Sequence, residues 1–223
     1  MLRASLARLY LRGRFELFER HRHRRLVLER FAGHPLVVLP EVFNPTLFLT
    51  TGFFASVLSP ELVPSTADVL DVGTGSGALA IVAALFARSV AAVDINPHAV
   101  RCARLNVMLN RCEDRVSVVE GDLFGPFDGR RFDVVLCNPP FYRGSPRDLW
   151  DASWRAPDFF ERFTGSLVGH LEPGGHALVL LSSLAEADAF FAGCAAGGLE
   201  TEVVGRRETL SETFSVYRVR RAA

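Results

Sequence analysis

A glycine-rich segment, Asp71-Val-Gly-Thr-Gly-Ser-Gly77, limits the folds open to this chain more than any other feature. It joins an apolar run at 69–72, which predicts a buried strand, to an alanine-rich run at 78–87, which predicts a buried helix. Glycine permits the sharp turn between them and lets a ligand approach the backbone closely. The first N–H groups of the helix have no partner within it, so they point towards that ligand. Alone, such a segment fits a dinucleotide site or an ordinary strand-to-helix turn.

The composition is that of one globular domain. A chain of 223 residues is long enough to bury a core, and a hydrophobic content of 49% excludes a disordered protein. No apolar run reaches transmembrane length and no signal-peptide pattern is present, so we expect no association with membranes. Four cysteines without CxxC spacing favour a reduced, cytoplasmic protein with no metal site. They are Cys102, Cys112, Cys137 and Cys194.

Charge is unevenly distributed, although the formal net charge is zero. Residues 1–30 contain nine arginines and three glutamates, and apolar residues recur among them at roughly helical spacing. We therefore expect a basic helical arm over residues 1–40 and a single domain over residues 41–223. In the simpler interpretation the arm packs on the domain with its arginines in solvent. In the alternative it binds RNA, DNA or an acidic protein surface.

Apolar runs of strand length alternate with helical segments along the rest of the chain. Further strands are expected at 89–93, 116–119, 132–137 and 177–181. Strands that are apolar throughout and alternate with helices predict a parallel sheet covered on both faces. The last two segments, 200–206 and 213–220, alternate apolar and polar residues and predict an antiparallel strand pair.

Polar residues follow the predicted strands at the edge where such sheets bind ligands, which is the carboxyl end of the strands. Asp94 lies 23 positions after Asp71, about where nucleotide-binding folds place the carboxylate that accepts from ribose hydroxyls. Its simpler role would be to cap the next helix. Asp122 follows the third strand and could accept a hydrogen bond from the exocyclic amino group of a purine.

The tetrapeptide Asn138-Pro-Pro-Phe141 follows the fourth strand. An asparagine side-chain oxygen and a proline carbonyl can together accept both hydrogens of one planar –NH₂ group. Two such acceptors hold the group in place and favour positive charge developing on its nitrogen. Phe141 can pack on the planar group that carries the amine. A simple strand-ending turn is the less favoured interpretation.

Other kinds of site find no support. The glycine segment lacks the GxSxG frame of a nucleophile elbow, and the Walker motif needs a lysine, which this chain lacks.

Thr50 and Thr51 precede an apolar run that ends near Pro60, and either residue could cap a helix formed by that run. The aromatic loop from Tyr142 to Pro157 is long for a connection after a strand, which is typical of a functional loop.

These motifs resemble those of the class I S-adenosylmethionine-dependent methyltransferases, and within them the (D/N)PP(Y/F) amino-methyltransferases. The resemblance covers roughly residues 40–220 and implies an α/β, Rossmann-like fold with a mostly parallel seven-stranded sheet. It implies S-adenosyl-L-methionine as the cofactor and the tetrapeptide Asn138, Pro139, Pro140 and Phe141 as the catalytic residues. The implied cofactor-binding residues are Thr51, Asp71, Gly73, Thr74, Gly75, Gly77, Asp94, Ile95, Asp122, Leu123 and Asn138.

Within that group the chain is most similar to the HemK-type glutamine methyltransferases of release factors. The similarity rests on Val42-Phe-Asn-Pro45 followed by Thr51, and on Glu208-Thr-Leu with the later Ser215-Val. It implies a protein glutamine substrate, whose amide Asn138 would hold. Phe141 departs from the usual tyrosine and is shared with some ribosomal RNA guanine and tRNA adenine methyltransferases. An exocyclic amine of RNA or DNA, or a small-molecule amine, is therefore the alternative substrate.

Overall fold

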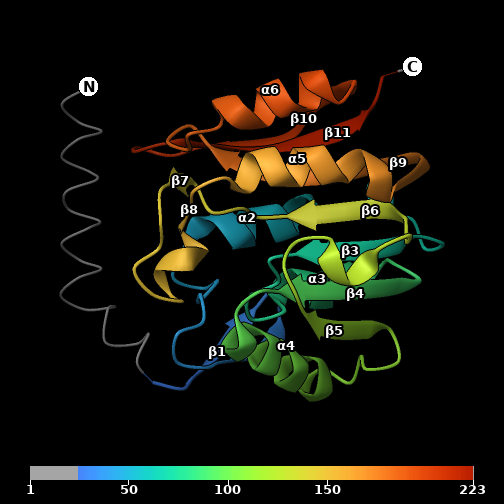
Figure 1. Cartoon of the computed structure of the whole chain (residues 1–223). Coiled ribbons are helices and arrows are strands. Elements are labelled where there is room, and N and C mark those ends of the chain that lie inside the picture. The colour runs from blue at the N-terminus through green and yellow to red at the C-terminus, as the bar shows by residue number, and fades with distance from the viewer. Residues whose placement is uncertain (1–24, 223) are drawn as a thin grey trace.

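The computed structural model describes residues 25–222, and its centre is a seven-stranded sheet (Figure 1). The strand order is β10-β11-β9-β6-β3-β4-β5. The strands are β3 (Asp68–Val72), β4 (Ser89–Asp94), β5 (Val116–Glu120), β6 (Phe132–Cys137), β9 (Leu171–Ser182), β10 (Leu199–Glu208) and β11 (Thr213–Arg221). The longer helices are α2 (Leu49–Val57), α3 (Ala78–Ala83), α4 (Pro97–Leu109), α5 (Phe159–His170) and α6 (Asp188–Ala196).

The sheet is parallel from β5 to β9, and only β11 runs antiparallel to both of its neighbours. The predicted mostly parallel sheet with an antiparallel C-terminal pair is therefore confirmed. Chain order reverses between β3 and β6, since β4 and β5 lie on one side of β3 and the later strands on the other. Ligands of open α/β sheets bind at such a reversal point.

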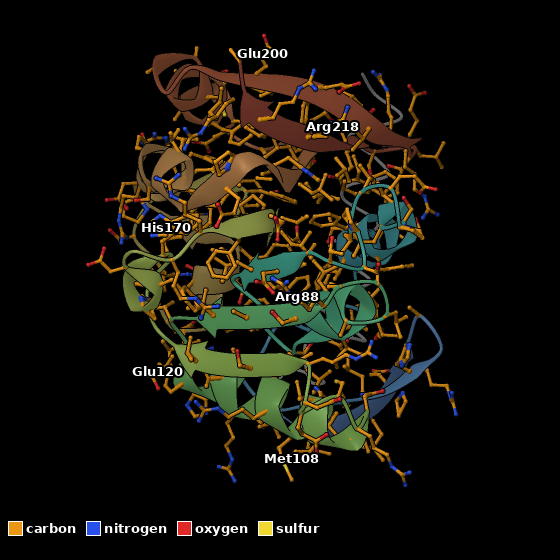
Figure 2. The ribbon with its side chains drawn as sticks, turned by 90° about the vertical axis from the view of Figure 1, so that its right-hand side faces the viewer. Arg88, Met108, Glu120, His170, Glu200 and Arg218 are labelled. Carbon is orange, nitrogen blue, oxygen red and sulfur yellow. The ribbon has the colours of Figure 1, made fainter. Side chains whose placement is uncertain are left out.

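Alternate residues of each strand pack into different layers, because strand side chains point to opposite faces. Val69 and Leu136 contact the core that the sheet shares with α2, α3 and α4. Their neighbours Leu70 and Val135 contact a second core shared with α5 and α6. Side chains fill the space between the sheet and the helices on each of its faces (Figure 2). In the same view Glu200 of β10 and Met108 of α4 lie at opposite ends of the molecule. Burial on both faces explains why these strands are apolar throughout.

The predicted helical arm over residues 1–40 is wrong for its last part. β1 (Val27–Phe31) and β2 (His34–Val38) form an antiparallel hairpin instead. Ala32 and Gly33 make its turn with left-handed backbone, at φ of 48° and 86°. Residues 1–24, which hold seven of the chain's first nine arginines, lie outside the described residues, so the arm itself stays a prediction.

Contacts with α4 explain the hairpin, because tertiary packing overrides helical spacing in a short segment. The buried side chain of Asn106 on α4 accepts from the backbone nitrogen of Val37 and donates to its oxygen, both at 2.7 Å. Asn106 also donates to the backbone oxygen of Ser76, at 2.8 Å. The hairpin is therefore anchored through α4 to the glycine segment.

One local prediction needs correction. α2 begins at Leu49, so Thr50 and Thr51 are buried within its first turn and neither is its N-cap. Residues 173–175 form an irregularity inside β9, where the pairing shifts from Phe132 with Leu171 to Val134 with His176. No helix in residues 25–222 has the length and apolarity needed to cross a membrane.

Candidate functional site

A cavity of about 320 Å³ lies beyond the carboxyl ends of β3, β4 and β6. The strand register explains its position, since Val72 of β3 pairs with Val93 of β4 and with Cys137 of β6. The segments that follow these residues therefore leave the sheet at one level. The predicted site residues that line the cavity are Thr51, Gly73, Thr74, Gly75, Asp94, Ile95, Asp122, Leu123, Asn138, Pro139, Pro140 and Phe141.

The glycine segment forms one wall of this cavity with left-handed backbone. Gly73, Gly75 and Gly77 have φ of 73°, 57° and 82°, a conformation that other residues adopt only at a cost. A Cβ at Gly73 or Gly75 would meet nothing within 4 Å, whereas a Cβ at Gly77 would lie 3.1 Å from Ala103 on α4. Gly73 and Gly75 thus present open backbone to a ligand, and Gly77 allows α3 and α4 to pack closely.

Asp71 supports this wall from beneath and does not line the cavity. Its buried carboxylate accepts a 2.6 Å hydrogen bond from the hydroxyl of Thr74. Burial raises the pKa of Asp71 to about 7, against the opposing effect of Thr74 and with a smaller rise from the charge of Asp94. Asp71 therefore fixes the conformation of the segment.

Asp94 ends β4 and binds the same segment from the side. Its carboxylate accepts from the backbone nitrogen of Gly75 at 2.8 Å and from that of Asn96 at 2.9 Å. Burial raises its pKa, and these backbone hydrogen bonds oppose the rise. Asp94 does not cap α4, because Asn96 is the N-cap and its side chain accepts from the backbone nitrogen of His98. Asp94 and its neighbour Ile95 both line the cavity.

Asp122 lies on the cavity wall beyond β5, beside Leu123, whose φ of 51° is left-handed. Its carboxylate is paired with Arg162 of α5, and both side chains are nearly half exposed. Sequence reasoning missed Arg162. In the sequence, Arg162 stands out only because it follows Asp158 by four residues, the spacing of an ion pair on one helical turn. That spacing does not show that the arginine faces this cavity.

Asn138 is held by a residue that is distant in sequence. Its side-chain nitrogen donates to the hydroxyl of Thr51 at 3.2 Å, from the first turn of α2. This contact uses the amide nitrogen and leaves the side-chain oxygen as an acceptor for a ligand. Phe141 is buried, lines the cavity, and accepts at its backbone oxygen from the nitrogen of Glu186. The end of the tetrapeptide is thereby fixed to the segment that follows β9.

An aromatic cluster of Phe43, Phe48, Trp150 and Trp154 lies beside the cavity, and only Phe43 and Trp154 of its members line it. The ring of Trp154 lies 5.1 Å from Phe43, 4.6 Å from Phe48 and 6.3 Å from Trp150, measured between centroids. Sequence reasoning predicted a functional loop that contains both tryptophans, but it missed their contacts with the two phenylalanines. Their separation of more than 100 residues from Trp154 gives no sequence signal of contact.

The rim segment, residues 142–162, comprises the loop before α5 and the first turn of α5, and it contains four arginines and four acidic residues. Each of these arginines has a carboxylate partner. The pairs are Arg143 with Glu161, Arg147 with Asp151, Arg155 with Asp151, and Arg162 with Asp122. The described rim therefore carries no net charge.

The described part of the chain contains no group of three or more His, Cys, Asp or Glu side chains that could bind a metal ion. All four cysteines are free. Burial raises the pKa of Cys102 and of Cys194 to about 11, so both thiols are protonated at neutral pH.

Comparison with known proteins identifies the family. Residues 36–199 match the protein family described as the methyltransferase small domain. The chain belongs to this family. The open backbone of Gly73 and Gly75, beside the acidic residues Asp94 and Asp122, fits S-adenosyl-L-methionine, the cofactor of the family. The protein is therefore an S-adenosyl-L-methionine-dependent methyltransferase.

Two relatives of this methyltransferase are named as acting on glutamine. A putative protein N5-glutamine methyltransferase of Methanocaldococcus jannaschii is 33% identical over 162 residues, which are 68% of this chain and 78% of the relative. A release factor glutamine methyltransferase of Geobacter sulfurreducens is 30% identical over 171 residues, which are 69% of this chain. The match spans 57% of the length of the Geobacter protein.

The fold is also that of RNA methyltransferases. The 16S rRNA N2 G1207 methyltransferase of T. thermophilus, solved with AdoMet and guanosine, superposes with a TM-score of 0.66 at 21% identity. The superposition covers 89% of this chain and 50% of the other. At this identity the likeness shows the fold alone.

Proposed function

We propose that this methyltransferase transfers a methyl group from S-adenosyl-L-methionine to the side-chain amide nitrogen of a glutamine in a protein, with translation release factors as the first candidate substrates. The observation that carries the proposal is the Asn138 amide, which lines the cavity and donates from its nitrogen to Thr51, so that its oxygen is left as an acceptor. The names of the two relatives support the same substrate class. A substrate in translation would place the protein in the cytoplasm.

The walls of the cavity divide naturally among the parts of the cofactor. The backbone of Gly73, Thr74 and Gly75 binds its methionine portion. Asp94 accepts from the ribose hydroxyls and Ile95 packs beside them. Asp122 accepts from the adenine amino group, and the backbone turn at Leu123 shapes that end of the cavity. S-adenosyl-L-methionine supplies, when bound, a methyl group activated by a positively charged sulfur.

The tetrapeptide positions the substrate nitrogen. The side-chain oxygen of Asn138 and a proline carbonyl accept its two N–H groups, so the nitrogen cannot rotate away from the methyl donor. The same two acceptors stabilise positive charge on this nitrogen in the transition state. Phe141 packs on the planar amide. No strong base is required, because the proton leaves after the new bond has formed.

Charge at the rim distinguishes the candidate substrates. Nucleic acid binding depends on cationic side chains that contact phosphates, whereas the arginines of the described rim are all paired with carboxylates. A protein segment needs no such excess of positive charge. The second candidate, an exocyclic amine of RNA or DNA, is favoured by Phe141 in place of tyrosine and by the arginines within residues 1–24.

Incubation with radiolabelled S-adenosyl-L-methionine and a cell lysate tests the proposal. Label that disappears with protease and survives ribonuclease is the expected result, and Asn138→Ala should abolish it. Met108→Ala, a change on the exposed face of α4, is the matched control and should keep full activity. Label that ribonuclease removes would assign RNA as the substrate. Label in neither fraction, with the cofactor still bound, would indicate a small-molecule amine.

A further inference from the structure

The indole nitrogen of Trp154 is a buried hydrogen-bond donor without an acceptor. In residues 25–222 only one other side-chain nitrogen or oxygen is both buried and unpartnered, and it belongs to Arg218, whose guanidinium bonds to Glu202 through another nitrogen. An indole has a single N–H, so Trp154 has no such second contact. Buried donors are nearly always satisfied, and an exception calls for a missing partner.

The backbone places Trp154 directly beside the catalytic tetrapeptide. Its carbonyl oxygen accepts a 2.9 Å hydrogen bond from the nitrogen of Tyr142, the residue that follows Phe141. The next residue, Arg155, begins β8 (Arg155–Ala156), which pairs with β7 (Tyr142–Arg143). Trp154 and Asn138 line the same cavity.

The indole ring is also contacted by the segment that leads into α2. Phe43 and Phe48 belong to this segment and both pack edge-on against Trp154. The same segment continues into Thr51, whose hydroxyl holds Asn138. Trp154 and Asn138 are therefore positioned by the same two pieces of chain.

We propose that the indole N–H of Trp154 donates a hydrogen bond to the carbonyl oxygen of the substrate amide while Asn138 accepts from its nitrogen. This proposal rests on the glutamine substrate of the proposed function and adds a specificity residue to it. A carboxamide presents donors on its nitrogen and an acceptor on its oxygen, so Asn138 and Trp154 form a complementary set. An alkyl amine such as a lysine side chain has no acceptor and leaves the indole unsatisfied.

Trp154 acts as a positioning residue and does not assist the chemical step. A hydrogen bond to the carbonyl oxygen draws electron density away from the amide nitrogen, so it does not make that nitrogen more reactive. Its effect belongs to substrate binding. Loss of the bond should therefore raise KM and leave kcat nearly unchanged.

Trp154→Phe, which keeps an aromatic ring in the cluster and removes the N–H, separates these effects. With a release-factor peptide centred on a glutamine, KM should rise about 3- to 10-fold, as for the loss of one neutral hydrogen bond, while kcat changes less than about threefold. Trp150→Phe is the matched control in the same cluster and should leave KM within about twofold. An unchanged KM in Trp154→Phe, or a loss confined to kcat, would overturn the proposal.

Nuclear magnetic resonance of the wild-type protein gives a readout that does not depend on a variant. The chain has two tryptophans, so its spectrum contains two indole N–H signals, and each Phe variant assigns one of them. Addition of the peptide in the presence of S-adenosylhomocysteine should move the Trp154 signal downfield. An unmoved Trp154 signal with methylatable peptide bound would overturn this proposal alone. Failure of the wild type to methylate any glutamine would overturn the proposed function as well.

Discussion

Thr51 on α2 and Asn138 at the end of β6 are 87 positions apart, and a 3.2 Å hydrogen bond joins their side chains at the cavity wall. The bond selects one orientation of the Asn138 amide, with its nitrogen towards Thr51 and its oxygen available to a substrate. Thr51 itself is buried, which keeps its hydroxyl in place. The arrangement makes Thr51 a support for the acceptor on which the proposed methyl transfer depends.

Thr51→Val should therefore lower kcat/KM about 3- to 10-fold, because the shape is kept while the hydrogen bond that orients Asn138 is lost. Steady-state kinetics with a methylatable glutamine peptide measure the change. Thr51→Ser keeps the hydroxyl and should stay within about threefold of the wild type. Equal losses in the Val and Ser variants would show that packing, and not the hydroxyl, is what matters.

Gly75→Ala should abolish or severely weaken cofactor binding. The left-handed φ of 57° makes a side chain costly there, by about 1–2 kcal/mol, and a Cβ would enter the space beside the ligand. Titration calorimetry with S-adenosylhomocysteine measures the affinity. Gly169→Ala on α5 is the control, since nothing lies within 4 Å of its Cβ, and it should stabilise the fold by about 0.5–1 kcal/mol. Tight binding by Gly75→Ala would contradict the assignment of this wall.

Asp71 should make the free energy of unfolding fall as pH rises. Its pKa is raised to about 7 in the folded chain, against about 4 in an unfolded one, so the unfolded state loses its proton first. The stabilising contribution is complete below pH 4 and is lost as the pH rises to about 7, by up to a few kcal/mol. Denaturant unfolding of the wild type and of Asp71→Asn at pH 5 and pH 8 measures this contribution of Asp71 to the free energy of unfolding. If the free energy of unfolding depended on pH in the same way in both proteins, the raised pKa of Asp71 would be refuted.

The pair of Asp122 and Arg162 should compete with the cofactor. If Asp122 accepts from the adenine amino group, it must share its carboxylate with an arginine that is already bound to it. Arg162→Gln should then tighten S-adenosylhomocysteine binding up to about fivefold, the limit for a half-exposed ion pair. Asp122→Asn should weaken binding. Weaker binding in Arg162→Gln would mean that the arginine contacts the cofactor directly.

The fold was predictable because its signals are local. Each apolar strand is followed directly in the sequence by the glycine segment or the polar residues of the site. The strand register then brings Gly73, Asp94 and Asn138 to one edge of the sheet. Contacts between distant segments were not predictable. The bond from Thr51 to Asn138 and the packing of Phe43 on Trp154 depend on how loops fold over the sheet.

The hairpin of β1 and β2 shows the same limit at the start of the domain. Helical spacing of apolar residues within residues 1–30 led us to predict a helical arm, but Val27–Phe31 is a strand paired with β2, and the side chain of Asn106 holds residue 37 of β2 in place. Only the tertiary structure decides between these outcomes, because a segment of this length is too short for periodicity to settle its conformation.

The most direct test of the central claim is mass spectrometry of a purified release factor after incubation with the enzyme and S-adenosyl-L-methionine. The expected result is one added methyl group on a glutamine side chain, its absence with Asn138→Ala, and a reduced yield with Thr51→Val. An unmodified release factor, together with a methylated base in RNA incubated with the enzyme in parallel, would contradict the proposed function and make this enzyme a nucleic-acid methyltransferase.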